Sequence, residues 1–376
     1  MMRTASIRAD QSAALLALRA AYAEACNRLV PVVRAHRLWN RVGLHQKTYR
    51  SLRKHTPLGS QMCCNAIFSV CKAYKAQKEL GRIQKDQPVP LVRFDRAAVH
   101  FDQRTYTIKD NGVSLYTLDG RIALSLVLGE HQKHILSAGK AKEAELIHRK
   151  GTWYFNLVVE SAEIEPVASD TVMGVDVGEN NLAAHSLGKV YGGEHLRDQR
   201  DRHLAHRRRL QSNGSQSARQ KLRQVSGKEQ RRVRHINHET SKAIVQDAVQ
   251  AGIGRITMED LTHIRSRIKA GKRVRARLHR WAWRQLQSFV AYKAKAVGIG
   301  VGYVNPAYTS QICAACGVLG KRHKHHFVCE HCGLRAHSDL NASRNLAQIG
   351  SGAPLSRAAV NTPDVAIGSV SNHALV

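Results

Sequence analysis

The chain has 376 residues, which is long enough for two or three modules that each bury a core. Lysine and arginine number 59 and aspartate and glutamate number 28, so the formal net charge is +31. This excess of positive charge predicts a polyanionic partner. Nucleic acid is favoured over anionic lipid, because no basic cluster lies beside an apolar span.

The first half of the chain is predicted to be a β-rich module that holds a helical insertion. Apolar residues at helical spacing predict a helix over residues 13–33 and a second over about 60–84. Alternating apolar and polar residues and turn signals predict strands between 88 and 160, with a hairpin over 144–157.

The second half has an α/β pattern, which begins after a linker predicted at 166–169. Strands are expected over 172–178, 253–259 and 298–304, and helices over 240–250 and 279–296. A stretch rich in Arg and His, 196–237, is also compatible with helix. The composition of residues 350–376, with weak periodicity, predicts a flexible tail.

Two observations bear on where the protein works. No apolar run is long enough to cross a bilayer, and no apolar signal core follows the first residues, so we expect a soluble intracellular protein. Half of the eight cysteines are scattered through apolar helical sequence. We interpret them as small buried thiols in a reducing compartment: Cys26, Cys63, Cys64 and Cys71.

Two CxxC knuckles near the C-terminus are the strongest single motif. They consist of Cys313, Cys316, Cys329 and Cys332, and a glycine follows each knuckle. Four thiolates on two tight turns predict a closed, tetrahedral zinc site with a structural role; disulfides or chance are the weaker alternatives. Possible substitute ligands are His323, His325, His326 and His331, and a basic tip is expected from Lys321, Arg322 and Lys324.

Three acids form a second candidate site. Asp176 lies inside an apolar strand, where an unpaired charge is costly; Glu259 ends a strand; and Asp339 opens a helix near its N-cap. Each acid alone is more often a solvated turn residue. Converging from two strands and a helix, their carboxylates would hold two Mg²⁺ or Mn²⁺ ions for cleavage of a phosphodiester.

Basic residues are concentrated in two runs, 197–234 and 265–280. A run of charge is usually a solvated face, but few acids interrupt these runs, which favours contact with nucleic acid phosphates. The candidates are Arg207, Arg208, Arg209, Arg231 and Arg232, with Lys72 and Lys75 in the first half. Trp281 and Trp283 are expected to be core residues of the next helix, and base stacking is the alternative.

These motifs together resemble the TnpB (OrfB) family of transposon-encoded proteins, which is related to compact type V CRISPR effectors. Residues 174–183, 258–261 and 339–345 resemble its three RuvC-type motifs, and 305–313 lead into its zinc ribbon, all in the family's order. The resemblance covers roughly residues 173–346. The departures are Ser343, where the family often has Ala, and Glu179 after the first motif.

The resemblance implies a multidomain α+β fold. Its implied parts are a wedge-type β-barrel at 1–10 and 86–165, a helical recognition insertion at 11–85, a ribonuclease-H-like (RuvC-type) α/β nuclease domain at 166–309 and 339–349, and a zinc ribbon at 310–338. In the family the first half binds the guide RNA and reads a short motif beside the DNA target. Asp176, Glu259 and Asp339 are implied to bind two Mg²⁺ (or Mn²⁺) ions, and the four cysteines one structural Zn²⁺.

The implied function is RNA-guided cleavage of double-stranded DNA in a prokaryotic cytoplasm, on the nucleoid. The guide RNA pairs with the target strand, and two-metal hydrolysis leaves 5′-phosphate and 3′-hydroxyl ends. A type V CRISPR effector would use the same chemistry, and the neighbouring DNA distinguishes it. A guided repressor that does not cut is disfavoured by the intact acids. A strand-joining transposase is disfavoured by the ribbon between the second and third acids.

Overall fold

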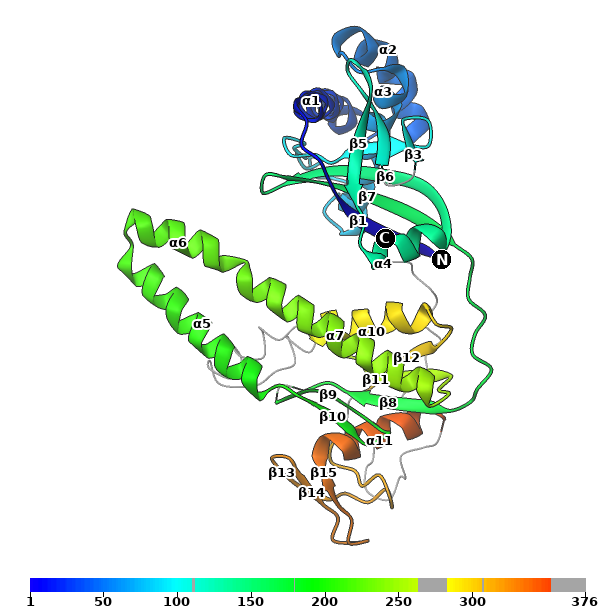
Figure 1. The fold of residues 1–376 in the computed structure, drawn as a ribbon, viewed down its shortest axis with the longest axis vertical. Coiled ribbons are helices and arrows are strands. Elements are labelled where there is room, and N and C mark those ends of the chain that lie inside the picture. The colour runs from blue at the N-terminus through cyan, green and yellow to red at the C-terminus, as the bar shows by residue number, and fades with distance from the viewer. Residues whose placement is uncertain (110–111, 179, 263–282, 306–307, 353–376) are drawn as a thin grey trace. The chain divides into compact units, whose positions relative to one another are not determined.

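The chain forms two compact units, Met1–Glu163 and Ile164–Val376 (Figure 1). The computed structural model describes residues 1–109, 112–178, 180–262, 283–305 and 308–352, except for the side chains of His195 and Arg197. The basic run predicted at 265–280, Glu179, Trp281 and residues 353–376 of the predicted tail lie outside the described residues.

An antiparallel sheet with strand order β2-β6-β7-β1-β5-β4-β3 forms the centre of unit 1. Its strands are β1 Met2–Ala9, β2 Val99–Asp102, β3 Tyr106–Lys109, β4 Gly112–Thr117, β5 Gly120–Val127, β6 Gly139–Arg149 and β7 Thr152–Ser161. The hairpin predicted at 144–157 is confirmed as β6 and β7. Every second residue of β7 is buried, from Trp153 to Val159, because side chains alternate between the faces of a strand.

Three helices follow one another between β1 and β2, and a fourth lies between β5 and β6. They are α1 Ala13–His36, α2 Arg41–His55, α3 Ser60–Glu79 and α4 Glu130–Ser137. The helices predicted at 13–33 and 60–84 are confirmed, although α3 ends earlier, where Gly81 has a positive φ of 69°. We did not predict α2 individually, because only Leu44, Thr48 and Leu52 of it are buried.

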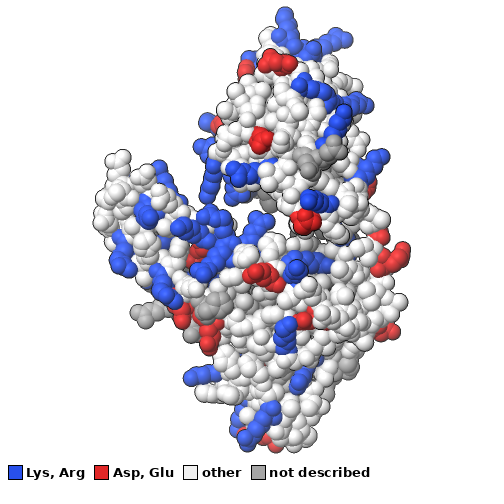
Figure 2. Space-filling model, in the orientation of Figure 1, with Lys and Arg blue, Asp and Glu red and all other residues white. Residues whose placement is uncertain are grey.

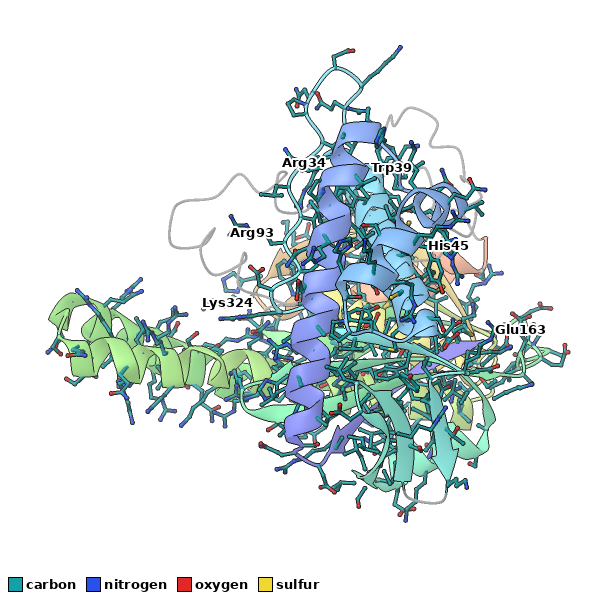
Figure 3. All side chains as sticks on the ribbon, turned by 90° about the horizontal axis from the view of Figure 1, so that it is seen from above. Arg34, Trp39, His45, Arg93, Glu163 and Lys324 are labelled. Carbon is teal, nitrogen blue, oxygen red and sulfur yellow. The ribbon has the colours of Figure 1, made fainter. Side chains whose placement is uncertain are left out.

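Side chains from well-separated parts of the sequence join in unit 1. Figure 3 shows Arg34 and Trp39 near the C-terminal end of α1 and His45 on α2. Arg34 Nε donates to the Val89 carbonyl at 2.9 Å, which ties the segment after α3 to α1.

Cys26, Cys63 and Cys71 are buried in the core of unit 1 and Cys64 is half-buried, so the interpretation of these four as buried thiols is largely confirmed.

Unit 2 is built on a five-stranded sheet in the order β10-β9-β8-β11-β12. The strands are β8 Val172–Asp176, β9 Asn181–His185, β10 Lys189–Gly192, β11 Arg255–Glu259 and β12 Gly300–Val304. Strands β8, β11 and β12 are parallel, and β9 and β10 are antiparallel additions at one edge. The three strands predicted in this half are therefore confirmed as the parallel part of the sheet.

Helices cover both faces of this sheet (Figure 1). On one face α7 (Lys228–Gln250) and α10 (Trp283–Lys295) pack against Met173, Val175, Ile256 and Met258. On the other face α11 (Ser338–Gly350) lies across β8. Trp283 is buried in the first of these layers, which confirms the expectation that it is a core residue.

Two further substructures complete unit 2. The stretch predicted as helix-compatible at 196–237 forms α5 (Glu194–Asn213), α6 (Gln216–Ser226) and the first part of α7, because Gly214 turns the chain with a φ of 65°. Between β12 and α11 three short strands form a small antiparallel sheet: β13 Lys321–His323, β14 His326–Val328 and β15 Arg335–His337. No helix in the described residues is both long enough and apolar enough to span a membrane.

Candidate active site and metal centre

The three predicted acids line one pocket. Asp176 is the last residue of β8 and Glu259 the last of β11, and the carboxyl ends of parallel strands meet at one edge of a sheet. The side of the sheet that faces α7 and α10 carries Met173, Val175, Ile256 and Met258. Because side chains alternate along a strand, Asp176 and Glu259 point to the opposite face, which carries α11. Asp339, in the first turn of α11, completes the group.

This pocket has a volume of about 340 Å³ and is strongly polar. Its lining residues are Asp176, Val177, Gly178, Asn180, Glu259, Thr309, Ser310, Arg322, His325 and Asp339. The structure therefore brings together the three acids that the sequence singled out, although they are spread over more than 160 residues of the chain.

Gly174 allows α11 to lie directly on β8. A Cβ atom at this position would stand 1.9 Å from the Ser343 carbonyl oxygen and 2.5 Å from the Ala347 nitrogen, both backbone atoms of α11. Any larger residue would push the helix off the strand and carry Asp339 away from Asp176. Ser343, one departure from the family pattern, is fully buried and donates its hydroxyl to Leu340 O within the helix at 2.9 Å.

The acids perturb one another in this pocket. Burial, and next the carboxylates of Glu259 and Asp339, raise the pKa of Asp176 well above its ordinary value. Burial also raises the pKa of Glu259. Burial and mutual repulsion favour the protonated forms of these carboxylates. A bound cation would offset that repulsion and stabilise the charged forms. Oxygen ligands of this kind fit Mg²⁺ or Mn²⁺.

Neutral side chains orient two of the carboxylates. They lie within the motifs at 174–183 and 305–313, but neither was predicted as a site residue. The buried Thr309 hydroxyl donates to Glu259 Oε1 at 2.7 Å, and Asn181 Nδ2 donates to Asp339 Oδ2 at 2.8 Å. From α10, Gln287 Nε2 donates to the Glu259 carbonyl oxygen at 2.7 Å. Such partners fix the direction in which a ligand presents its oxygen.

Arg322 enters the same pocket from strand β13. Its Nη2 lies 3.3 Å from Asp339 Oδ1, and its side chain is 40% exposed. The expected basic tip needs correction at Arg322, which faces the acids, whereas Lys321 is exposed and pairs with Glu330 at 2.6 Å. The opposite charge of the Asp339 carboxylate attracts the Arg322 guanidinium to this wall of the pocket.

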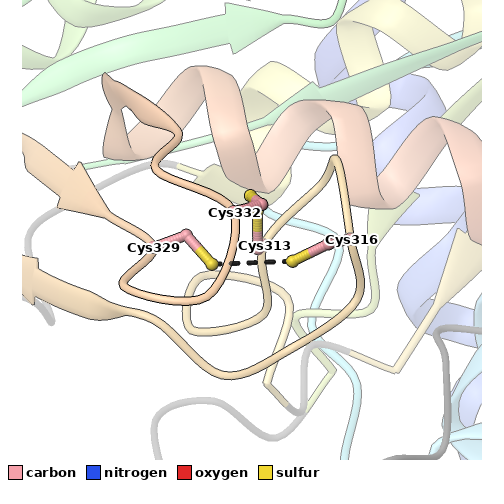
Figure 4. Close-up of side chains that lie close together, drawn as sticks. All are labelled: Cys313, Cys316, Cys329 and Cys332. Atoms are coloured by element: carbon pink, nitrogen blue, oxygen red, sulfur yellow. Dashed lines mark hydrogen bonds between the residues drawn. The ribbon is translucent and has the colours of Figure 1, made fainter.

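Four cysteines form a compact cluster beside the pocket (Figure 4). The sulfur atoms of Cys313 and Cys332 lie 3.6 Å apart, and those of Cys316 and Cys329 lie 3.5 Å apart. A tetrahedral zinc site with sulfur ligands needs separations of about 3.8 Å. The four thiols therefore fit a zinc ion, and none of the nearby histidines is needed as a ligand.

Backbone geometry shapes both knuckles as their sequence predicts. Gly317 and Gly333 have positive φ angles of 73° and 76°, which favour glycine. Each glycine N–H donates to the carbonyl of the first cysteine of its knuckle at 2.9 Å. Backbone N–H groups, first that of Cys332, lower the pKa of Cys329 to about 7.

Helix α11 couples the cysteine cluster to the acids. Asn341 donates to Ile312 O at 2.7 Å and accepts from the Ala314 N–H at 2.9 Å, so it holds the first knuckle at both sides. Asn345 donates to the carbonyls of Thr309 and Ile312 at 2.8 and 2.7 Å. The helix that carries Asp339 thus positions both the cysteines and the threonine that orients Glu259.

Comparison with known proteins matches the second unit to one family. A family model described as OrfB_IS605, probable transposase, matches residues 156–265, and a second, the Cas12f1-like TNB domain, matches residues 283–346. The TnpB-like protein MJ0751 of Methanocaldococcus jannaschii is 29% identical over 241 residues, which are 60% of this chain and 85% of that protein. Residues 156–346 are therefore similar to proteins of the TnpB (OrfB) and Cas12f1-like group.

Other proteins to which the chain is similar are CRISPR-associated. The endodeoxyribonuclease Cas12f1 of Sulfoacidibacillus thermotolerans is 32% identical over 232 residues, which are 54% of this chain and about half (52%) of that relative's length. The solved Cas12f1–sgRNA–target DNA complex matches with a TM-score of 0.66 at 14% identity, over 92% of this chain and 98% of that one. At this identity the likeness shows the fold, and it confirms the multidomain α+β class.

The predicted nucleic-acid contacts lie on helices of both units. Figure 2 shows Lys and Arg side chains along the arm formed by α5, α6 and α7. Arg208, Arg209, Arg231 and Arg232 are exposed there, and Arg207 is half-buried. In unit 1, Lys72 and Lys75 are both exposed, and Lys72 also forms an ion pair with Glu145 at 3.3 Å. Their role in binding remains a prediction.

Proposed function

We propose that this chain is an RNA-guided DNA endonuclease whose pocket of three acids hydrolyses phosphodiesters with two bound divalent cations. The observation that carries the proposal is the convergence of Asp176, Glu259 and Asp339 from β8, β11 and α11 on one pocket. Relatives named as endodeoxyribonucleases support the reaction, and a matching fold bound to sgRNA and target DNA supports the partners.

We assign the units as follows. The five-stranded sheet of unit 2 with its helices is the RuvC-like nuclease domain, and β13 to β15 with the four cysteines are its zinc ribbon. The seven-stranded sheet of unit 1 is the wedge barrel, and α1 to α3 between β1 and β2 are the recognition insertion. Mixed sheets covered by helices on both faces support the first assignment, and the helical excursion within an antiparallel sheet supports the second.

Each polar residue of the pocket has a role in this reaction. Two Mg²⁺ or Mn²⁺ ions held by Asp176, Glu259 and Asp339 would activate water and neutralise charge on the phosphate. Thr309 and Asn181 orient the carboxylates of Glu259 and Asp339. Arg322 brings a positive charge to the wall of the pocket, where it is placed to attract the scissile phosphate.

The four cysteines hold one structural Zn²⁺ in this proposal. A site with four thiolates leaves no open position for a reacting group, so the ion would stabilise the ribbon rather than take part in hydrolysis. Through Asn341 and Asn345 the ribbon in turn holds Thr309 beside Glu259.

The guide RNA is identified by the nucleic acid that the protein retains. We would express the protein together with the DNA that flanks its gene, purify it at moderate salt and sequence the bound RNA. One structured RNA with a variable end is expected, and DNA matching that end should be cut only with Mg²⁺ or Mn²⁺. Heterogeneous RNA, or none, would contradict guided action. The flanking DNA, a transposon end or a repeat array, distinguishes a transposon protein from a CRISPR effector.

Replacing Thr309 tests whether orientation of Glu259 matters. Thr309→Val keeps the volume but removes the hydroxyl that donates to Glu259, so we expect the Mg²⁺ concentration for half-maximal cleavage to rise about tenfold or more. Thr309→Ser keeps the donor and should behave like the wild type. The measurement is a Mg²⁺ titration of cleavage under single-turnover conditions. Equal Mg²⁺ requirements for the two variants would remove Thr309 from the site.

A further inference from the structure

A second group of ligand-type side chains lies at the rim of the acid pocket. His325, His337 and Asp339 place one ligand atom each within 4.8 Å of the others. His325 is in the turn between β13 and β14, and His337 ends β15 directly before α11. The group is separate from the four cysteines and shares only Asp339 with the three acids.

The two imidazole rings are held in place. They are stacked, with centroids 5.4 Å apart and an angle of 26° between their planes. The Asp339 backbone N–H donates to His337 Nδ1 at 3.2 Å, and the Ser338 N–H donates to the His325 carbonyl oxygen at 2.8 Å. Both histidines are therefore fixed to the first turn of the helix that carries Asp339.

The hydrogen bond to His337 also fixes its tautomer. Because Nδ1 accepts an N–H, it carries a lone pair directed toward Asp339, and the neutral ring has its proton on Nε2. A metal ion bound to Nδ1 would replace this one hydrogen bond and leave Nε2–H intact. The His325 ring makes no hydrogen bond in the described part of the chain, so its nitrogen atoms remain available.

Imidazole ligands distinguish this group from the three acids. Mg²⁺ prefers oxygen ligands throughout, whereas two imidazoles and one carboxylate suit Zn²⁺, Co²⁺ and similar ions. Two metal sites of different preference would then compete for the carboxylate of Asp339.

We propose that His325, His337 and Asp339 form a transition-metal site, distinct from the cysteine site, and that an ion bound there withdraws Asp339 from the catalytic cations and stops cleavage. The binding of the ion stands on the geometry alone, and the inhibition rests on the proposed function. Arg322 opposes binding, because its guanidinium lies 3.3 Å from Asp339 Oδ1. Its side chain is 40% exposed, so it can turn out to solvent when an ion binds.

Binding is tested first, without any cleavage assay. The full-length protein is prepared with zinc on its cysteines, dialysed free of excess metal and titrated with Co²⁺, whose visible absorption reports nitrogen and oxygen ligands. We expect one Co²⁺ per chain whose absorption shows nitrogen ligands, in addition to any Co²⁺ held by the carboxylates alone. His325→Ala and His337→Asn should weaken it more than about tenfold, since even the partners of ligands contribute that much. Asparagine is a good helix cap, so His337→Asn keeps α11 intact.

Control variants separate this site from unspecific binding to histidine. His326→Ala removes an exposed imidazole of the same ribbon and should leave Co²⁺ binding unchanged. Arg322→Gln should tighten it by removing the opposing charge. No Co²⁺ with nitrogen ligands in the wild type, or wild-type binding of it by both His325→Ala and His337→Asn, would overturn the site.

Inhibition is tested with saturating Mg²⁺ and increasing free Zn²⁺. Cleavage by the wild type should fall, and His325→Ala and His337→Asn should need at least about tenfold more Zn²⁺ for the same loss. Equal inhibition of all variants would overturn the regulatory role while the Co²⁺ titration still decides the site. A wild type that never cuts DNA would instead count against the proposed function.

Discussion

Asp176→Asn is expected to reduce DNA cleavage by roughly a thousandfold or more, which corresponds to about 4 kcal/mol of lost transition-state stabilisation. Asp176 is buried, and the negative charges of both Glu259 and Asp339 raise its pKa further. Asparagine keeps the shape of the side chain but removes the negative charge that would hold the cations. Target binding should be unchanged, because base pairing and basic side chains provide it. Single-turnover cleavage and a gel-shift measurement check the two expectations.

The same substitution should stabilise the metal-free protein. Burial and two neighbouring carboxylates raise the pKa of Asp176 above its value of 3.8 in an unfolded chain. The folded state then binds more protons than the unfolded state, so the wild type loses stability as pH rises above that value. Asp176→Asn removes this loss. A gain of about 1 kcal/mol would raise Tm by roughly 2–4 °C at neutral pH in EDTA.

An exposed acid of the same unit provides the matched control. Asp170→Asn changes the net charge equally but lies outside the pocket, so cleavage and Tm should both remain at wild-type values. Full cleavage by Asp176→Asn would refute the assignment of the acids. A lower Tm of the metal-free variant would show that the carboxylate has a stabilising partner instead of the mutual repulsion argued above.

Cys329→Ser is expected to remove the bound zinc and, with it, about a hundredfold or more of the cleavage activity. Cys329 is fully buried, and its sulfur lies 3.5 Å from that of Cys316. A closed site with only three thiolates binds zinc far more weakly, and small metal-dependent substructures unfold without their ion. Loss of the ribbon would release Arg322 from the pocket and Thr309 from Glu259. Metal analysis should find one zinc per chain in the wild type and none in the variant.

The cysteines of unit 1 allow a matched comparison. Cys64→Ser alters a half-buried thiol on α3, far from the knuckles in sequence, and should keep one zinc and full cleavage. Zinc retained by Cys329→Ser at wild-type level would mean that another ligand, such as His331, completes the site. Loss of zinc without loss of cleavage would show that the ribbon does not position the acids.

Local patterns in the sequence were sufficient for the elements with strong periodicity. The long helices of unit 1, the β6–β7 hairpin and the three parallel strands of unit 2 follow from apolar spacing, because burial of one face imposes that spacing. Helix α2 has a thin buried stripe, and β9 and β10 are short edge strands, so their patterns were too weak to predict individually. The 196–237 stretch lacks a strong apolar stripe, which hid its division into separate helices.

The candidate site residues could also be predicted from the sequence, because few other functions require these residue types at these spacings. Two CxxC knuckles with following glycines predict a tetrahedral thiolate site, and the structure brings the four sulfurs together. One acid at the end of an apolar strand is a weak indication of a metal site. Three acids in the order found in a known family are a much stronger one. The period of two along β8 and β11 then places Asp176 and Glu259 on one face.

The sequence by itself predicted an anionic partner, the residue types of the two candidate metal sites and the resemblance to the TnpB (OrfB) family. Tertiary structure alone decided what surrounds those residues. Asn181 donates to Asp339, which lies 158 positions away in the sequence, and Thr309 donates to Glu259, which lies 50 positions away. Arg322 contacts Asp339 in the acid pocket instead of forming part of the expected basic tip. Such contacts depend on strand order and on the approach of α11 to β8 at Gly174. Sequence periodicity reports only which face of an element is buried, and it carries no information about which distant side chain will lie opposite.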